Sequence, residues 1–155
     1  MDFSLPPNCH PKIRALHDYW AGKRRGRAMP ARADLDPIDI PALLPHVFLI
    51  EVKAAEPQLL TYRVFGTALV ELFGFDFTLQ EVGKGTLPEH LPEMRARYGR
   101  VIRDGQPYYH RTRLRDRLND FTDVDRIILP LSPDGARVDQ MIGMTIPISN
   151  MPRRW

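Results

Sequence analysis

The feature that most constrains the fold is a strand that runs into a short helix through a single glycine. It lies in the stretch LLTYRVFGTALVELFG, residues 59–74. Leu60, Tyr62 and Val64 occupy alternate positions, which is the pattern of a half-buried strand. Gly66 then permits a sharp turn, because it has no Cβ. A strand that turns directly into an apolar helix lays that helix across one end of a sheet and begins a pocket.

The helix after this glycine is expected over Thr67–Phe73. The hydroxyl of Thr67 is predicted to cap it by accepting the free N–H groups of the first turn. Gly74 is a natural residue to end it. Three apolar residues share one face of this helix at helical spacing, namely Leu69, Leu72 and Phe73.

Apolar periodicity, with proline and glycine at element ends, predicts the remaining elements. The expected helices are Pro11 to about Ala21, Asp39 to Leu44, and Glu89 to Asp104, and the further strands are Val47–Lys53, Tyr108–Arg115, Val124–Leu131 and Val138–Ile148. This order predicts an α+β fold: a five-stranded antiparallel sheet with helices on one face, preceded by an N-terminal amphipathic helix. We expect residues 1–28 to form a leader and that helix, 29–148 the domain, and 149–155 a tail.

The N-terminal helix carries an apolar stripe of Ile13, Leu16 and Trp20. Such a stripe must be covered. Either its own sheet or a second copy of the chain fits, so the three residues are candidate interface residues of a homodimer.

Composition narrows the class of protein. A chain of 155 residues with 43% hydrophobic content predicts one domain with a real core. The single cysteine, Cys9, excludes a disulfide within the chain. No apolar run approaches the ~20 residues that span a bilayer, and the first residues do not resemble a signal peptide. These features predict a soluble cytoplasmic protein without a membrane span.

Known catalytic, metal and nucleic-acid patterns are missing. We find no GxSxG, HExxH or glycine-rich phosphate loop, and no spacing typical of metal ligands. Nucleic-acid binding is disfavoured, because the arginines of residues 111–117 are accompanied by acidic residues and by few aromatics. The acidic residues are Asp116, Asp120, Asp123 and Asp125. The chain is therefore expected not to be an enzyme. A small acid–base enzyme using His110 or His90 remains an alternative.

Four runs resemble a known family. They are HPKIRALHDYW at 10–20, MPARADLDPIDIPALLPHVFLIEV at 29–52, YRVFGTALVELFGFDFTL at 62–79, and IILPLSPDG at 127–135. Together with the element order, they resemble the PAS_5 family of PAS-like domains, which are bacterial and mostly alphaproteobacterial. The resemblance covers about residues 10–148 and implies a sensory or interaction fold, but it does not imply an activity.

PAS domains typically hold a small molecule between the sheet and its helices, and the resemblance implies such a pocket here. On the third expected strand, His110 shares the inward face with Tyr108 and Thr112, while Tyr109, Arg111, Arg113 and Arg115 are assigned to solvent. The alternatives for His110 are a hydrogen-bonded, semi-buried histidine or a ligand contact. The full predicted lining is Tyr62, Val64, Leu69, Leu72, Phe73, Phe77, Met94, Tyr98, Tyr108, His110, Ile128, Ile142 and Met144. A purely structural interaction domain would instead fill this space with its own Phe and Leu side chains.

The resemblance also permits tests of cofactor chemistry. Light-sensing flavin PAS domains use a cysteine on the helix after the second strand, and residues 67–79 contain none, so cysteinyl-flavin chemistry is excluded. Haem PAS domains commonly use a histidine on or near the long helix. His90 has that position, but a lone histidine is weak evidence, so haem is disfavoured and the cofactor is left open.

The sequence after Ile148 is only SNMPRRW, which contains no kinase, cyclase or DNA-binding segment. We therefore expect the protein to act through another signalling protein, such as a kinase or regulator.

Overall fold

Five antiparallel strands form one sheet in the order β2-β1-β5-β4-β3. The strands are β1 Val47–Ala54, β2 Leu59–Phe65, β3 Tyr108–Arg115, β4 Phe121–Leu131 and β5 Gln140–Pro147. The structure is a computed structural model that describes residues 3–148, so the predicted tail at 149–155 lies outside the described residues. The predicted α+β fold with a five-stranded antiparallel sheet is confirmed, although β4 begins at Phe121 rather than Val124.

The helices are α1 Pro11–Lys23, α2 Thr67–Phe73 and α3 Leu91–Asp104, with 3₁₀ turns at Arg32–Asp34, Pro37–Asp39, Leu44–His46 and Pro88–His90. The predicted helix from Asp39 to Leu44 is wrong, because a 3₁₀ turn ends at Asp39 and the next begins at Leu44. Pro41 and Pro45 fall in this segment, and a proline has no N–H to donate to a helical hydrogen-bond ladder.

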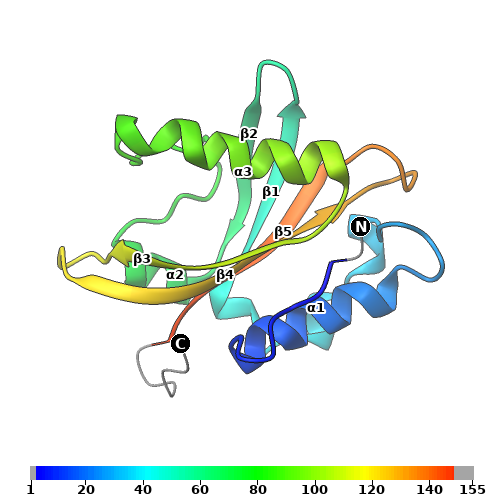
Figure 1. Ribbon diagram of the computed structural model, residues 1–155, viewed down its shortest axis with the longest axis horizontal. Helices are drawn as coiled ribbons and strands as arrows, with labels where there is room; N and C mark the ends of the chain where they lie inside the picture. The colour runs from blue at the N-terminus through cyan, green and yellow to red at the C-terminus, as the bar shows by residue number, and fades with distance from the viewer. Residues whose placement is uncertain (1–2, 149–155) are drawn as a thin grey trace.

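Helices cover both faces of the sheet (Figure 1). Successive side chains of a strand point to opposite faces. On β4, Asp125 accepts a hydrogen bond from the backbone N–H of His10, at the start of α1. The next residue, Arg126, donates to the hydroxyl of Tyr98 on α3. Therefore α1 lies on one face of the sheet, and α3 lies on the other.

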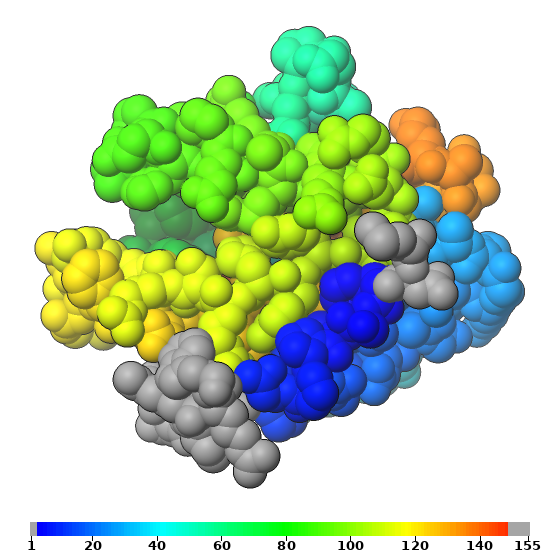
Figure 2. Space-filling view, in the orientation of Figure 1, coloured from blue at the N-terminus to red at the C-terminus, as the bar shows by residue number. Residues whose placement is uncertain are grey.

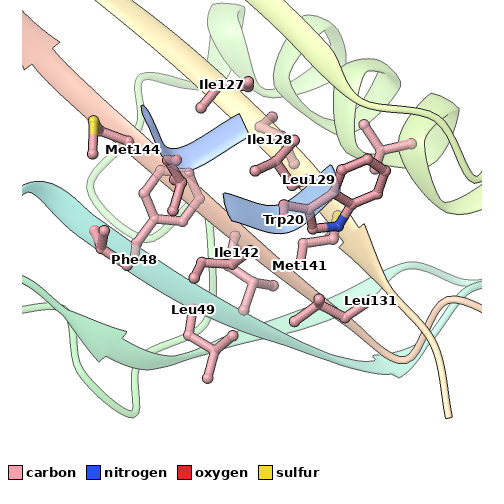
Figure 3. Packing of buried hydrophobic residues seen from close by; sticks show 14 of the residues in the cluster. Trp20, Phe48, Leu49, Ile127, Ile128, Leu129, Leu131, Met141, Ile142 and Met144 are labelled. Atoms are coloured by element: carbon pink, nitrogen blue, oxygen red, sulfur yellow. The ribbon is translucent and has the colours of Figure 1, made fainter. Parts of the chain in front are cut away.

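The apolar stripe of α1 is buried within its own chain. Ile13 and Leu16 are 0% exposed and Trp20 is 2% exposed. The indole Nε1 of Trp20 donates to the carbonyl of Pro130 at 2.7 Å, and Figure 3 shows Trp20 among buried side chains of β4 and β5. Of the two destinations expected for the stripe, its own sheet is the one observed. These residues are therefore core residues here, and no exposed dimer surface is formed by them.

A β-bulge in β2 changes which side chains share a face. Phe48 pairs with Phe65 and Leu49 with Val64, but Ile50 pairs with Tyr62, so one β2 residue is skipped. The extra residue places Tyr62 and Phe65 on the same face and turns Val64 to the other. The predicted simple alternation, with Tyr62 and Val64 together, is therefore wrong.

Gly66, rather than Thr67, is the N-cap of α2, and no side chain caps this helix. A Cβ on Gly66 would lie 2.2 Å from the backbone oxygen of Pro45, which is closer than atoms can pack. The glycine therefore allows the strand–helix junction to pass directly against the turn before β1.

Candidate functional site

A cavity of about 310 Å³ lies between the sheet and the α2 and α3 helices. Phe48, Arg126 and Thr145 contribute to it from three strands of the sheet. Other lining residues come from β2, β3, α2, α3 and the connection between the helices, namely Tyr62, Phe65, Leu69, Phe73, Phe77, Gly83, Lys84, Gly85, Thr86, Leu87, His90, Met94, Leu114 and Arg115. Figure 2 shows the surface hollowed between the green segment ahead of α3 and the yellow β3–β4 hairpin.

Four aromatic rings form one side of the cavity, which we call the aromatic wall: Tyr62, Phe65, Phe73 and Phe77. The ring centroids of Tyr62 and Phe65 lie 5.2 Å apart, and those of Phe65 and Phe77 lie 5.4 Å apart, both edge to face. Phe73 packs on Phe65 at 6.1 Å. These distances are typical of favourable aromatic pairs, so the rings hold one another in place. The wall depends on the bulge that brings Tyr62 and Phe65 to one face.

The loop before α3 closes over this wall. Gly85 has φ +91°, a left-handed conformation that favours glycine. An added Cβ there would lie 3.2 Å from the ring of Phe77. The loop backbone therefore lies directly against the aromatic wall.

Arg126 brings a half-buried positive charge to the sheet side of the cavity. Its Nη2 donates to the hydroxyl of Tyr98, and its guanidinium carbon lies 5.2 Å from the ring centroid of Phe48. Its Nε is buried and has no hydrogen-bond partner among the described residues. Burial raises the pKa of the neighbouring Tyr62 phenol well above its usual range, and Arg126 only partly offsets this, so Tyr62 is neutral. The guanidinium is thus the charged group of this buried cluster.

The mouth of the cavity is also cationic or titratable. Lys84 and Arg115 line it, together with the exposed ring of His90. Within the described part of the chain, no Asp or Glu is among the lining residues. Clefts lined by one sign of charge concentrate ions of the opposite sign. The cavity therefore combines an apolar wall with a positive interior.

His110 lies beside this site but does not line the cavity. It pairs with Arg126 across β3 and β4, and its Nδ1 is buried without a partner among the described residues. Burial lowers the pKa of His110 to about 4, and the charges of Arg126 and Arg97 act in the same direction. His110 is therefore neutral at pH 7.

Residues 8–146 match the family model described as a PAS domain, PAS_5. The chain is a PAS domain. It is similar in fold to the Rhodobacter sphaeroides LOV protein, with 12% identity, TM-score 0.56, and coverage of 76% of this chain and 69% of that chain. It is also similar to a PAS domain of a Colwellia psychrerythraea protein, with 9% identity, TM-score 0.54, and coverage of 74% and 98%.

A third similar structure is a sensory box histidine kinase/response regulator from Burkholderia thailandensis, with 12% identity, TM-score 0.50, and coverage of 74% of this chain and 86% of that chain. No curated protein matches the sequence. PAS domains are typical of sensory signalling modules. Within residues 3–148, no helix has the length and apolar character needed to cross a membrane.

The PAS domain brings together only part of the predicted lining. Tyr62, Leu69, Phe73, Phe77 and Met94 line the cavity, and Tyr98 supports it through Arg126. Ile128 and Met144 are fully buried in the sheet without lining it.

Four predicted residues lie elsewhere on the PAS domain. Val64 and Ile142 line a separate hollow under the segment before β1, on the α1 face of the sheet. Val64 is there because of the bulge. Leu72 lines a groove beside the β3–β4 turn, and Tyr108 lies near the C-terminal end of α3.

The residues that sequence reasoning missed are chiefly Phe48, Phe65, Arg126 and Thr145. Arg126 carried a usable signal, because it is a lone cation at the start of the apolar run IILPL in β4. The sequence around Phe65 gave no signal that this residue lines the cavity, because only the bulge turns it toward the cavity.

The opposite face of the PAS domain holds a paired charge. Arg111 was expected to face solvent, but its side chain is only 18% exposed and its Nε donates to Asp125 at 2.7 Å. The Tyr109 hydroxyl donates to the same carboxylate at 2.9 Å. This part of the prediction is wrong because α1 covers that face. Arg113 is exposed as predicted and pairs with Asp123.

The only cysteine belongs to the α1 face as well. Cys9 is buried, and its thiol pKa is raised chiefly by burial, with Arg14 and Asp125 as charged neighbours. It therefore lies across the sheet from the cavity. Because no described residue that lines the cavity is a cysteine, these residues do not fit cysteinyl-flavin chemistry.

Proposed function

We propose that this PAS domain is a non-catalytic sensory module that binds a small molecule in the cavity and signals its occupancy to a partner protein. The open cavity, with an aromatic wall and a half-buried cation, is the observation that carries the proposal. Its volume of about 310 Å³ lies at the small end of the range of ligand pockets, which is about 300–1,000 Å³. A small ligand therefore fits better than a large one.

The expected partner is a cytoplasmic kinase or regulator. One protein of similar fold is a sensory box histidine kinase/response regulator, which supports this class of partner. Ligand occupancy can reach the α1 face through β4, because Arg126 at the cavity and Asp125 beside α1 are adjacent in one strand. A homodimer remains part of the proposal, on a surface other than the buried stripe of α1.

The two alternative functions have less support. A purely structural domain should fill the hollow with its own side chains, whereas a cavity is observed. An acid–base enzyme needs a carboxylate or hydroxyl that orients the histidine. Among the described residues, the buried Nδ1 of His110 has no such partner, so the sensory function is favoured.

Filling the cavity tests the proposal. Leu114 lines the cavity from β3, and we expect Leu114→Trp to block it. Ile38 is 83% exposed and lies outside the cavity, so Ile38→Trp is the matched control. A library of small organic compounds is screened against the full chain by ligand-observed NMR. We expect binders whose signals are lost with Leu114→Trp and retained with Ile38→Trp. The proposal fails if no compound binds, or if binding is insensitive to Leu114→Trp.

A further inference from the structure

We propose that the ligand is a small organic acid, with one carboxylate held by Arg126 and an apolar body packed on the aromatic wall. This inference rests on the proposed function, because it names the chemical class that the same cavity accepts. Three features of the site carry it: the sign of its charges, an unused donor, and the separation of polar and apolar surfaces.

The charges of the cavity lack a counter-charge. Lys84, Arg115 and Arg126 line it, and none of its described lining residues is acidic. Arg126 is half-buried, and the reduced local dielectric strengthens its interaction with an anion compared with an exposed arginine. A ligand with a negative charge would therefore supply the counter-charge that the lining residues of the cavity lack.

The unused donor is the Nε of Arg126, which is buried without an acceptor. A buried donor is unfavourable until it is paired. The side chains around it leave this Nε unpaired, because the ring of Phe48 offers only its face and the hydroxyls of Tyr98 and Tyr62 interact with other parts of the guanidinium. A carboxylate is the group that matches a guanidinium best, since each of its oxygens accepts a charge-assisted hydrogen bond.

The other two cations argue for a single carboxylate. Lys84 donates to the side chain of Gln80 at 2.8 Å, and Arg115 donates to the backbone of Asn119 at 3.0 Å. Both are exposed residues at the mouth, so they attract an anion without being free to grip a second acidic group deep inside. The interior beyond Arg126 is the aromatic wall with Leu69 and Met94, which favours an apolar body.

Matched acid and amide probes test the charge separately from the shape. Phenylacetate and hexanoate are titrated into the full chain by calorimetry and ligand-observed NMR, beside phenylacetamide and hexanamide. We expect at least one acid to bind at least about tenfold more tightly than its amide. We expect Arg126→Gln to remove this preference by weakening the acid while leaving the amide unchanged.

Two further variants complete the test. Arg63→Gln removes an exposed arginine that pairs with Glu51 outside the cavity, and it should keep the acid preference. Arg126→Lys keeps a charge but loses the planar donor group, so it should bind the acid with intermediate affinity. This variant decides the question if Arg126→Gln does not fold.

The outcomes separate the two proposals. If neutral compounds bind in the cavity but neither acid exceeds its amide, the inference about the carboxylate is overturned and the proposed function stands. The carboxylate inference is likewise overturned if the acid preference survives in both Arg126 variants. If neither these probes nor any library compound binds, the proposed function itself fails.

Discussion

The two faces of the sheet differ in how completely the chain pairs their charged side chains, and two adjacent residues of β4 show the contrast. Asp125 is 0% exposed and accepts hydrogen bonds from the backbone of His10, the hydroxyl of Tyr109, and the guanidinium of Arg111. Arg126 points to the other face, donates to the phenol of Tyr98, and keeps a buried Nε without a partner among the described residues. One face is completed by the chain itself, and the other holds a cavity with an uncompensated charge.

This difference follows from what covers each face. On the α1 side, Arg111, Tyr109 and the start of α1 converge on one carboxylate, which satisfies it. The hydrogen bond to Asp125 is the main reason that the pKa of Arg111 is raised. On the other side, the α2 and α3 helices leave a cavity open. We infer that the α1 face serves stability and the α3 face serves binding.

The largest expected effect on stability comes from replacing Asp125, the charged residue that is fully paired. Asp125→Asn leaves Arg111 without its counter-ion while keeping the shape of the side chain. Removing one partner of a buried ion pair costs about 3–5 kcal/mol, so the free energy of unfolding should fall by roughly that amount. Urea denaturation measures it. The matched control is Asp123→Asn, whose partner Arg113 is 59% exposed and which should cost at most about 1 kcal/mol. Equal losses of unfolding free energy in the two variants would contradict the structural role assigned to Asp125.

A smaller effect is expected one residue further along the strand. Arg126→Met replaces an incompletely paired charge by an apolar side chain of similar length. It also removes the donor to the buried hydroxyl of Tyr98, so the free energy of unfolding should fall by about 1–3 kcal/mol, less than for Asp125→Asn. The same urea experiment measures it. A loss as large as that of Asp125→Asn would mean that both faces are built for stability, and the comparison would fail.

A pH dependence of stability is also expected at the cavity face. The pKa of His110 is about 4 in the folded protein, against about 6.5 in an unfolded chain. Between these values the unfolded state binds the proton and the folded state does not, so this contribution to stability is present above about pH 6.5 and is lost as the pH falls toward 4.

Replacing this histidine removes its part of the pH dependence. His110→Gln should therefore flatten the fall of unfolding free energy between pH 7 and pH 4.5, measured by denaturation at several pH values. A slope unaffected by His110→Gln would contradict the burial of a neutral histidine beside Arg126.

Part of the candidate site was predictable from sequence. Leu69, Phe73 and Met94 lie on helices whose apolar faces follow the 3.6-residue period, and all three line the cavity. Tyr62 lines the cavity as well, whereas its expected neighbour Val64 lines a separate hollow on the other face of the sheet. The helical pattern is robust because each turn depends only on residues nearby in sequence. A strand face is not, because one skipped residue in the partner register exchanges the two faces.

The sequence by itself therefore determined the order of strands and helices, the strand–glycine–helix junction and the apolar stripe of α1, because these depend on local periodicity. Only the tertiary structure decided the bulge in β2, the covering of one face by α1, and the unequal treatment of Asp125 and Arg126. Those outcomes depend on contacts between residues far apart in sequence, such as His10 with Asp125 and Tyr98 with Arg126. Whether a buried charge is paired is a property of the neighbours that the fold supplies, and the residue's own place in the sequence does not reveal it.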